Sequence, residues 1–283
     1  MGRHKSAKGP DRKSKQRQGA RKADTADKYA LYEDAVQDPE IEMEFVADVY
    51  QELRGGPARV LREDFCGSAW AACEWAKRDP ANLAIGVDLD EDVLAWGRQR
   101  HWDALPADTR SRVKMISGDV LDTRSEPADI TVAMNFSYWI FKRRSQLLRY
   151  FRTVRDGLAD GGIFVMDAYG GYDAFKDEYT EKRKCDGFTY VWEQEDYDPV
   201  SGDYVCHISF RFPDGSGLRR AFSYHWRLWT LPEIRELLEE AGFSKVTIWW
   251  QGEDEDGEGD GEFEPVERGD ADPAWICYLV AER

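Results

Sequence analysis

Long hydrophobic runs are missing from this sequence of 283 residues. No apolar stretch approaches the roughly 18 residues of a membrane-spanning helix, and the basic N-terminus lacks the apolar core of a secretory signal. The five cysteines, at positions 66, 73, 185, 206 and 277, form no Cys-X-X-Cys pair and no cluster with histidine, so we expect no metal site. Scattered cysteines in odd number are typical of a reducing compartment, which predicts a cytoplasmic protein without a membrane partner.

Positive charge is scarce outside the N-terminal segment. The formal net charge is -16, yet residues 1–22 hold nine Lys or Arg against one Asp, which leaves the remaining residues strongly acidic. An acidic body repels phosphate backbones, so nucleic acid is an unlikely partner except through this basic segment. We expect residues 1–26 to be a basic disordered tail and residues 27–283 to form the folded domain.

Alternating apolar runs and turn residues predict an α/β protein. Asp38-Pro39 is typical of a helix start and Gly55-Gly56 of its end, and another long helix is expected at about 143–158. Five strands, each followed by a helix or a turn, predict a parallel sheet covered on both faces. The expected strands are 60–61, 82–87, 113–116, 130–134 and 163–167.

The pattern changes after the fifth strand. Three aromatic-rich runs lie at 187–194, 203–212 and 218–228, and turns that contain proline and glycine separate them. They predict an antiparallel meander inserted at about 185–229. A helix opening at Pro232 and strands at 246–250 and 275–280 complete the chain. The acidic, glycine-rich stretch at about 251–272 is expected to be a solvated loop, because its spacing of acidic residues does not match an EF-hand.

A glycine-containing turn, Cys66-Gly67-Ser68, connects the first strand to its helix, and Asp88 ends the second strand. A small residue lets the backbone approach a ligand, and the helix N-terminus offers free N–H groups. An acid roughly 20 residues later is where nucleotide-binding α/β folds bind ribose hydroxyls. The pattern therefore predicts a ligand that contains a nucleoside.

The order of motifs along residues 40–283 resembles a class I S-adenosylmethionine-dependent methyltransferase of the small-molecule type. The resemblance rests on the glycine turn, Asp88, Gly118-Asp119, Asn135-Phe136-Ser137, Gly161-Gly162 and the Leu-Pro-Glu-Ile-Arg-Glu-Leu-Leu helix opening at Leu231. It implies a Rossmann-like seven-stranded methyltransferase sheet, mostly parallel with an antiparallel C-terminal hairpin, and the meander as a lid. The implied cofactor is S-adenosyl-L-methionine, with S-adenosyl-L-homocysteine as product and no metal.

The resemblance also implies cofactor-binding positions. Glu63 matches the acid that opens the first motif, Asp88 the acid that takes both ribose hydroxyls, and Asp119 the acid that meets the adenine amino group. The full set is Glu63, Phe65, Cys66, Gly67, Ser68, Ala69, Asp88, Leu89, Asp119, Val120, Asn135 and Phe136. Phe65 and Ala69 stand where the family usually has glycine, and we expect a negative φ at Phe65 because it carries a Cβ atom.

Candidate groups for the methyl acceptor come from strand ends and from the meander. Catalytic candidates are His225, Tyr138 and Tyr169, and substrate-binding candidates are Ser137, Asp167, Tyr172, Trp192 and Arg227. In the functional interpretation His225 and Arg227 face the pocket as a base and an anion clamp; in the alternative they lie on a solvent face. Tyr29 and Tyr32 are expected to fold over the cofactor from the N-terminal segment.

Several functions remain open at this point. A small-molecule acceptor is preferred, but Asn135-Phe136-Ser137-Tyr138 also resembles the Asn-Pro-Pro-Tyr motif of amino-group methyltransferases, without its prolines, which leaves protein and nucleic-acid acceptors open. A nicotinamide-dependent oxidoreductase shares the turn and the acid. A non-catalytic cofactor-binding module docked to RNA or the ribosome by the basic tail is the last alternative. A monomer and a homodimer fit the sequence equally well.

Overall fold

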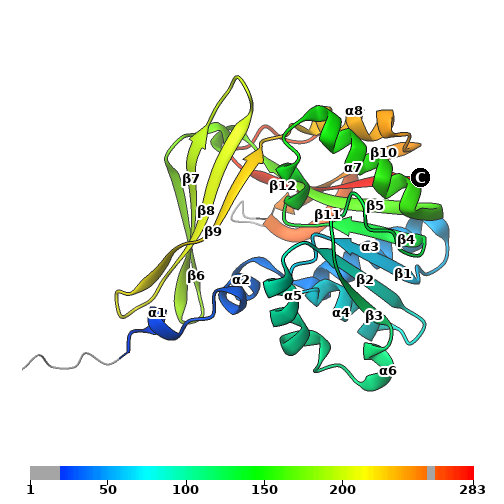
Figure 1. Ribbon diagram of the computed structural model, residues 1–283. Helices are drawn as coiled ribbons and strands as arrows, with labels where there is room; N and C mark the ends of the chain where they lie inside the picture. The colour runs from blue at the N-terminus through cyan, green and yellow to red at the C-terminus, as the bar shows by residue number, and fades with distance from the viewer. Residues whose placement is uncertain (1–19, 254–258) are drawn as a thin grey trace, which may run out of the picture.

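The structure is a computed structural model that describes residues 20–253 and 259–283, and it contains two separate β-sheets (Figure 1). The larger sheet has eight strands in the order β11-β10-β12-β5-β4-β1-β2-β3, and the smaller has four strands in the order β6-β7-β8-β9. The predicted class, a mostly parallel sheet with an antiparallel C-terminal hairpin and an inserted antiparallel meander, is confirmed.

Five strands of the large sheet run parallel to one another. They are β1 (Val60–Asp64), β2 (Leu83–Asp88), β3 (Val113–Ser117), β4 (Ala128–Ala133) and β5 (Leu158–Gly170). The chain moves outward from β1 to β3 on one side and then crosses to β4 on the other side of β1. The loops after β1 and β4 therefore leave the sheet in opposite directions, which marks the switch point where α/β sheets bind ligands.

Three antiparallel strands complete the large sheet. They are β10 (Lys245–Glu253), β11 (Gly259–Val266) and β12 (Trp275–Glu282). The prediction of a solvated loop is wrong for β11, which pairs with β10 and places Phe263 4.5 Å from the ring of Tyr278. The sheet therefore has eight strands rather than the predicted seven. Residues 254–258 of the predicted acidic loop lie outside the described residues.

Helices cover both faces of the large sheet. One face is packed by α3 (Pro39–Arg54), α4 (Trp70–Arg78) and α5 (Glu91–Gly97), and the other by α7 (Arg144–Gly157) and α8 (Leu231–Ala241). The predicted ends are confirmed: Asp38 caps α3, and Gly55 and Gly242 adopt positive φ after α3 and α8. Short elements are α6 (Ala107–Arg110), the π-helix η1 (Arg98–Trp102), and the 3₁₀ turns η2 (Ser137–Ile140) and η3 (Tyr172–Phe175).

The second sheet is a meander of four consecutive antiparallel strands. They are β6 (Tyr179–Cys185), β7 (Phe188–Tyr197), β8 (Asp203–Arg211) and β9 (Gly217–Arg227). The prediction of three strands starting near residue 185 is wrong because it omits β6. Residues 180–184 of β6 are exposed polar residues at the sheet edge, so they carry no apolar alternation.

The N-terminal segment is ordered earlier than predicted. Residues 1–19 of the predicted tail lie outside the described residues, but α1 (Lys22–Thr25) is helical and α2 (Lys28–Val36) follows it. The amide of Lys22 donates to Asp214 Oδ2 at 2.8 Å, which attaches α1 to the turn between β8 and β9. Figure 1 shows α2 between the meander and the α5 side of the large sheet. No helix within residues 20–253 and 259–283 has the length and apolarity needed to cross a membrane.

Candidate functional site

The turn after β1 adopts a strained backbone at the carboxyl end of the strand. Phe65, Gly67 and Ala69 have φ values of 59°, 53° and 56°, so all three lie in the left-handed region. The predicted negative φ at Phe65 is therefore wrong. Local hydrogen bonds hold the turn, since Cys66 N donates to Val87 O at 3.0 Å and Ala69 N to Cys66 O at 2.7 Å. The turn takes a conformation that favours glycine at each of the three positions, although two of them carry side chains.

Two glycines let neighbouring elements approach this turn. A Cβ atom at Gly86 of β2 would lie 2.9 Å from Cys66 Sγ and 3.1 Å from the Cβ of Ala69. A Cβ atom at Gly97 of α5 would lie only 2.1 Å from the carbonyl oxygen of Ser68. The turn is therefore fitted closely between β2 and α5, which fixes where its free amides point.

Asp88 joins the end of β2 to the same turn. Its Oδ2 accepts from Gly67 N at 2.7 Å and its Oδ1 from Asp90 N at 2.8 Å. Burial raises the pKa of this carboxyl, while both amides lower it. The side chain remains half-exposed, so its other lone pairs are open to a ligand. Asp88 thus lies where the sequence placed a ribose-binding acid.

Three further carboxyls gather on the α3 face of the sheet. Glu63 accepts from Ala72 N at 2.9 Å, and burial, with Glu42, Asp88 and Asp64 nearby, raises its pKa to about 8. Burial raises the pKa of Asp167 to about 7, and this carboxylate accepts from Asn135 N and Phe136 N at 2.8 and 2.9 Å.

Glu42 is the third of these carboxyls, and the sequence gave no signal for it. It lies one turn before Phe45 on α3, and the ring of Phe45 stacks on Tyr278 of β12 at 4.6 Å. Tyr278 is the ladder partner of Asp167. Burial, followed by the charge of Asp167, raises the pKa of Glu42 to about 7. The charges that raise the pKa of Glu42 and of Glu63 are other carboxylates, so this corner suits a cationic ligand group.

The remaining predicted cofactor residues line the ends of β2 and β3. Asp119 is half-buried and its Oδ1 accepts from Leu121 N at 2.9 Å. Val120 is buried, whereas Leu89 is 65% exposed. The structure therefore brings Asp88, Leu89 and Asp119 to the same sheet edge, because β2 and β3 are adjacent parallel strands.

A cluster of aromatic rings begins after β4 and continues into the meander. Asn135 and Phe136 follow β4 with φ values of 58° and 57°, and the Phe136 ring lies 4.6 Å from that of Tyr169. The meander adds further rings to this cluster: Trp192 lies 6.2 Å from Tyr169, and Trp226 6.3 Å from Phe136. We call this set the aromatic wall; its members are Phe136, Trp139, Tyr169, Trp192, Tyr204, Tyr224 and Trp226.

Polar atoms in the aromatic wall lack partners among the described residues. Trp139 Nε1, Tyr169 OH and Tyr204 OH are buried with no hydrogen-bond partner there. A buried donor without a partner is unfavourable, so these three groups carry an energetic cost inside the aromatic wall.

The structure contradicts two of the predicted catalytic roles. Tyr138 is fully buried and donates to the backbone oxygen of Asp167 at 2.8 Å, so its hydroxyl is used structurally. His225 is exposed, because β9 turns Tyr224 and Trp226 toward the large sheet. The prediction that His225 faces the pocket is wrong, since burying two aromatic rings outweighs burying one imidazole. Tyr169 is the catalytic candidate that does lie in the aromatic wall.

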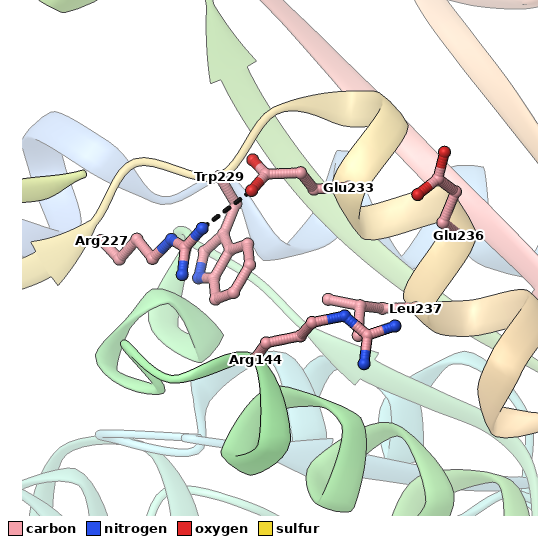
Figure 2. A pocket seen from close by; sticks show the side chains of 6 residues that line it. All are labelled: Arg144, Arg227, Trp229, Glu233, Glu236 and Leu237. Carbon is pink, nitrogen blue, oxygen red and sulfur yellow. Dashed lines mark hydrogen bonds and ion pairs between the residues drawn. The ribbon is translucent and has the colours of Figure 1, made fainter. Parts of the chain in front are cut away.

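Arg227, the last residue of β9, lies beside α8 (Figure 2). Its guanidinium bonds Glu233 at 2.8 Å and lies 3.8 Å over the ring of Trp229. It lines a small hollow together with Arg144 and Leu237 from α7 and α8. The predicted anion clamp is therefore wrong, because this cation is already paired with a carboxylate.

The other predicted acceptor residues are spread along the site. Ser137 Oγ donates to Met134 O at 2.8 Å, and Tyr172 in η3 is 58% exposed. Trp192 lies in the aromatic wall. Tyr32 and Tyr29 of α2 pack on Phe222 of β9 at 5.0 and 6.0 Å, so the N-terminal segment does reach the meander.

The turn has one more contact that the sequence did not reveal. Glu33 of α2, only 3% exposed, accepts from Ser68 Oγ at 2.7 Å. The two residues are 35 positions apart, which no local pattern connects. Among the described residues, no group of three or more His, Cys, Asp or Glu side chains is arranged to hold a metal ion.

No protein-family model and no curated protein matches the sequence. Solved structures do match. A S-adenosylmethionine-dependent methyltransferase from Clostridium acetobutylicum superposes with a TM-score of 0.64 at 17% identity, covering 90% of this chain and 96% of that one. CalS10, an amino pentose methyltransferase from Micromonospora echinaspora with bound cofactor, gives 0.63 at 18% identity over 90% and 95%. KedS8, a sugar N-methyltransferase from Streptoalloteichus, gives 0.59 at 19% identity over 100% and 98%. The chain has the fold of these S-adenosylmethionine-dependent methyltransferases.

Proposed function

We propose that this protein is a S-adenosylmethionine-dependent methyltransferase that acts on a small molecule. The observation that carries the proposal is the hydrogen bond from the Gly67 amide to Asp88, which joins a left-handed turn to an acid at the end of β2, beside the sheet's switch point. Ligands bind α/β sheets at this position. The fold shared with the matching methyltransferases supports the same conclusion.

The residues present suit this cofactor chemically. Asp88 would accept from the ribose hydroxyls and Asp119 from the adenine amino group. Glu63, whose carboxyl is buried beside Glu42, would face the positively charged methionine portion. A cation at this corner relieves the repulsion among the carboxylates, which is a physical reason for burying them together. When bound, the cofactor supplies a sulfonium methyl group that is already activated for transfer.

The protein's own task is to align the acceptor. Phe136 and Tyr169 would hold it against the aromatic wall, and the meander would exclude water. The wall offers ring faces beside Asp167, a setting that suits an amine, since ammonium groups bind aromatic faces and carboxylates. The names of CalS10 and KedS8, an amino pentose and a sugar N-methyltransferase, support an amine acceptor.

A matched pair of acceptors tests this function. The protein would be incubated with methyl-labelled S-adenosylmethionine and either aminosugars or the sugars in which a hydroxyl replaces the amine. We expect label in the amines, with loss of transfer in Tyr169→Ala. Label only in hydroxyl compounds would contradict the amine acceptor. A protein that binds the cofactor but methylates neither set nor any protein would favour a non-catalytic binding module.

A further inference from the structure

The N-terminal helix α2 places a buried carboxylate against the cofactor turn. Glu33 Oε1 accepts from Ser68 Oγ at 2.7 Å and lies 2.6 Å from His101 Nε2, while Oε2 accepts from Arg100 Nε at 3.2 Å. Burying a carboxylate is unfavourable unless hydrogen bonds and opposite charges compensate it. Glu33 receives three such partners, and one of them belongs to the turn itself.

The partners of Glu33 contact the turn at the two residues that flank Ala69, namely Ser68 and Trp70. The ring of His101 stacks on Trp70, the first residue of α4, at 5.1 Å and 4°. Both His101 and Arg100 come from the π-helix η1, a rare element that is frequent at functional sites. The carboxylate therefore contacts the turn directly through Ser68 and indirectly through Trp70.

The opposite side of α2 belongs to the meander. Ala35 is buried in a cluster with Phe210 of β8, and the ring of Tyr32 lies 5.0 Å from Phe222 of β9. The preceding α1 is bonded to the turn between β8 and β9 through the Lys22 amide. Helix α2 thus connects the sheet that carries part of the aromatic wall to the turn that would hold the cofactor.

We infer that Glu33 is a positioning residue that couples the cofactor turn to the meander through α2. Binding of the cofactor to the turn then orders α2 and β9, and so completes the acceptor side of the site. The inference rests on the proposed function, because it takes residues 66–69 as the cofactor turn. It assigns helix α2 a positioning role at the active site.

The test compares Glu33→Gln, which keeps the shape of the side chain and removes its charge, with Ser68→Ala, which removes the donor. Asp34→Asn is the matched control, because Asp34 is the exposed neighbour on the same helix. Binding of S-adenosylhomocysteine would be measured by calorimetry in the full-length protein. Charge-assisted hydrogen bonds predict a roughly tenfold weaker Kd for each of the two variants. The double variant should lose less affinity than the sum of the two single losses, because both substitutions act on the hydrogen bond between Glu33 and Ser68.

Hydrogen exchange supplies the readout that a purely structural role would not change. In the wild type, S-adenosylhomocysteine should slow amide exchange in the turn and also in α2 and β9. In Glu33→Gln the turn should still be protected, whereas the added protection of α2 and β9 should be lost. The inference would be overturned if Glu33→Gln bound S-adenosylhomocysteine with the wild-type affinity and if the ligand protected α2 and β9 as much as in the wild type. Failure of the wild type to bind at all would instead overturn the proposed function, so the two results are distinguishable.

Discussion

Replacing Asp88 by alanine removes two kinds of interaction, the hydrogen bonds from backbone amides and the proposed hydrogen bonds from the cofactor's ribose. The carboxylate accepts from the amides of Gly67 and Asp90 at 2.7 and 2.8 Å, and it is the proposed acceptor for two ribose hydroxyls. Hydrogen bonds to a charged group are each worth about 1.5–3 kcal/mol. Loss of both ribose bonds therefore predicts a binding free energy weaker by about 3 kcal/mol, roughly a hundredfold in Kd.

The same substitution should lower stability, but by less. The two amides are near solvent, so water replaces much of what the carboxylate supplied, and we expect a loss of about 1–2 kcal/mol. For a chain of this size that corresponds to a fall in Tm of about 2–8 °C. Asp88→Asn keeps one carbonyl oxygen and the side-chain shape, so it should recover most of the stability and little of the affinity.

Calorimetry with S-adenosylhomocysteine and a thermal melt separate these two effects. The expected result is a folded Asp88→Ala protein with a much weaker Kd, and an Asp88→Asn protein that melts near the wild type while still binding weakly. A folded Asp88→Ala variant whose Kd stays within about threefold of the wild type would refute the assignment of this acid to the ribose.

Three further predictions follow from buried contacts. Arg62→Met should lower the free energy of unfolding by about 3–5 kcal/mol in a urea titration, because it leaves the buried carboxylate of Asp64 without its charged partner. Asp64 is 1% exposed and bonded to Arg62 at 2.7 Å. A loss below about 1 kcal/mol would contradict this reasoning. Gly97→Ala should lower Tm and weaken S-adenosylhomocysteine binding together, since its Cβ would meet a backbone oxygen at 2.1 Å; an unchanged melt would refute that close approach. Glu63 and Asp167 have pKa values raised to about 8 and about 7, so the folded state holds protons that the unfolded chain releases. Their contribution to stability is present at low pH and is lost as pH rises through about 7–8. Without ligand, the urea midpoint should therefore be lower at about pH 8.5 than at about pH 6. An equal or higher midpoint at the upper pH would contradict the burial of both carboxyls.

The strand-end residues were predictable because they follow from local patterns. Apolar runs located β1, β2, β4 and β5, and parallel strands bring their carboxyl ends to one edge. The sequence pattern therefore predicts the correct edge of the sheet for Asp88 and Asp167. Helix ends at Asp38, Gly55 and Gly242 were equally readable, because capping depends on neighbouring residues.

Errors arose where tertiary contacts outweighed local preference. The positive φ of Phe65 is held by the bond of the next residue, Cys66, to β2 and by ring contact with Tyr150 at 5.5 Å, neither of which local sequence shows. Strand β11 is glycine-rich and acidic, yet pairing with β10 and the burial of Phe263 hold it in the sheet. For β9 the alternation was correct, but which face points inward was decided by Tyr224 and Trp226.

Contacts between distant segments were beyond reach of the sequence pattern. Glu33 accepts a hydrogen bond from Ser68 across 35 residues, and the charge of Asp167 on β5 raises the pKa of Glu42 on α3. In the sequence on either side of them, neither glutamate differs from the many other acidic residues of this chain. Their surroundings become visible only when α2 and α3 are packed against the rest of the fold.

The most direct measurement of the central claim is the heat of binding of S-adenosylhomocysteine to the full-length protein, with NADH as the control. The proposed function predicts one site of micromolar affinity for S-adenosylhomocysteine and no heat with NADH. Binding of NADH alone would indicate an oxidoreductase. Absence of binding to either would mean that Phe65 and Ala69 close the turn to a nucleoside, and would contradict the account.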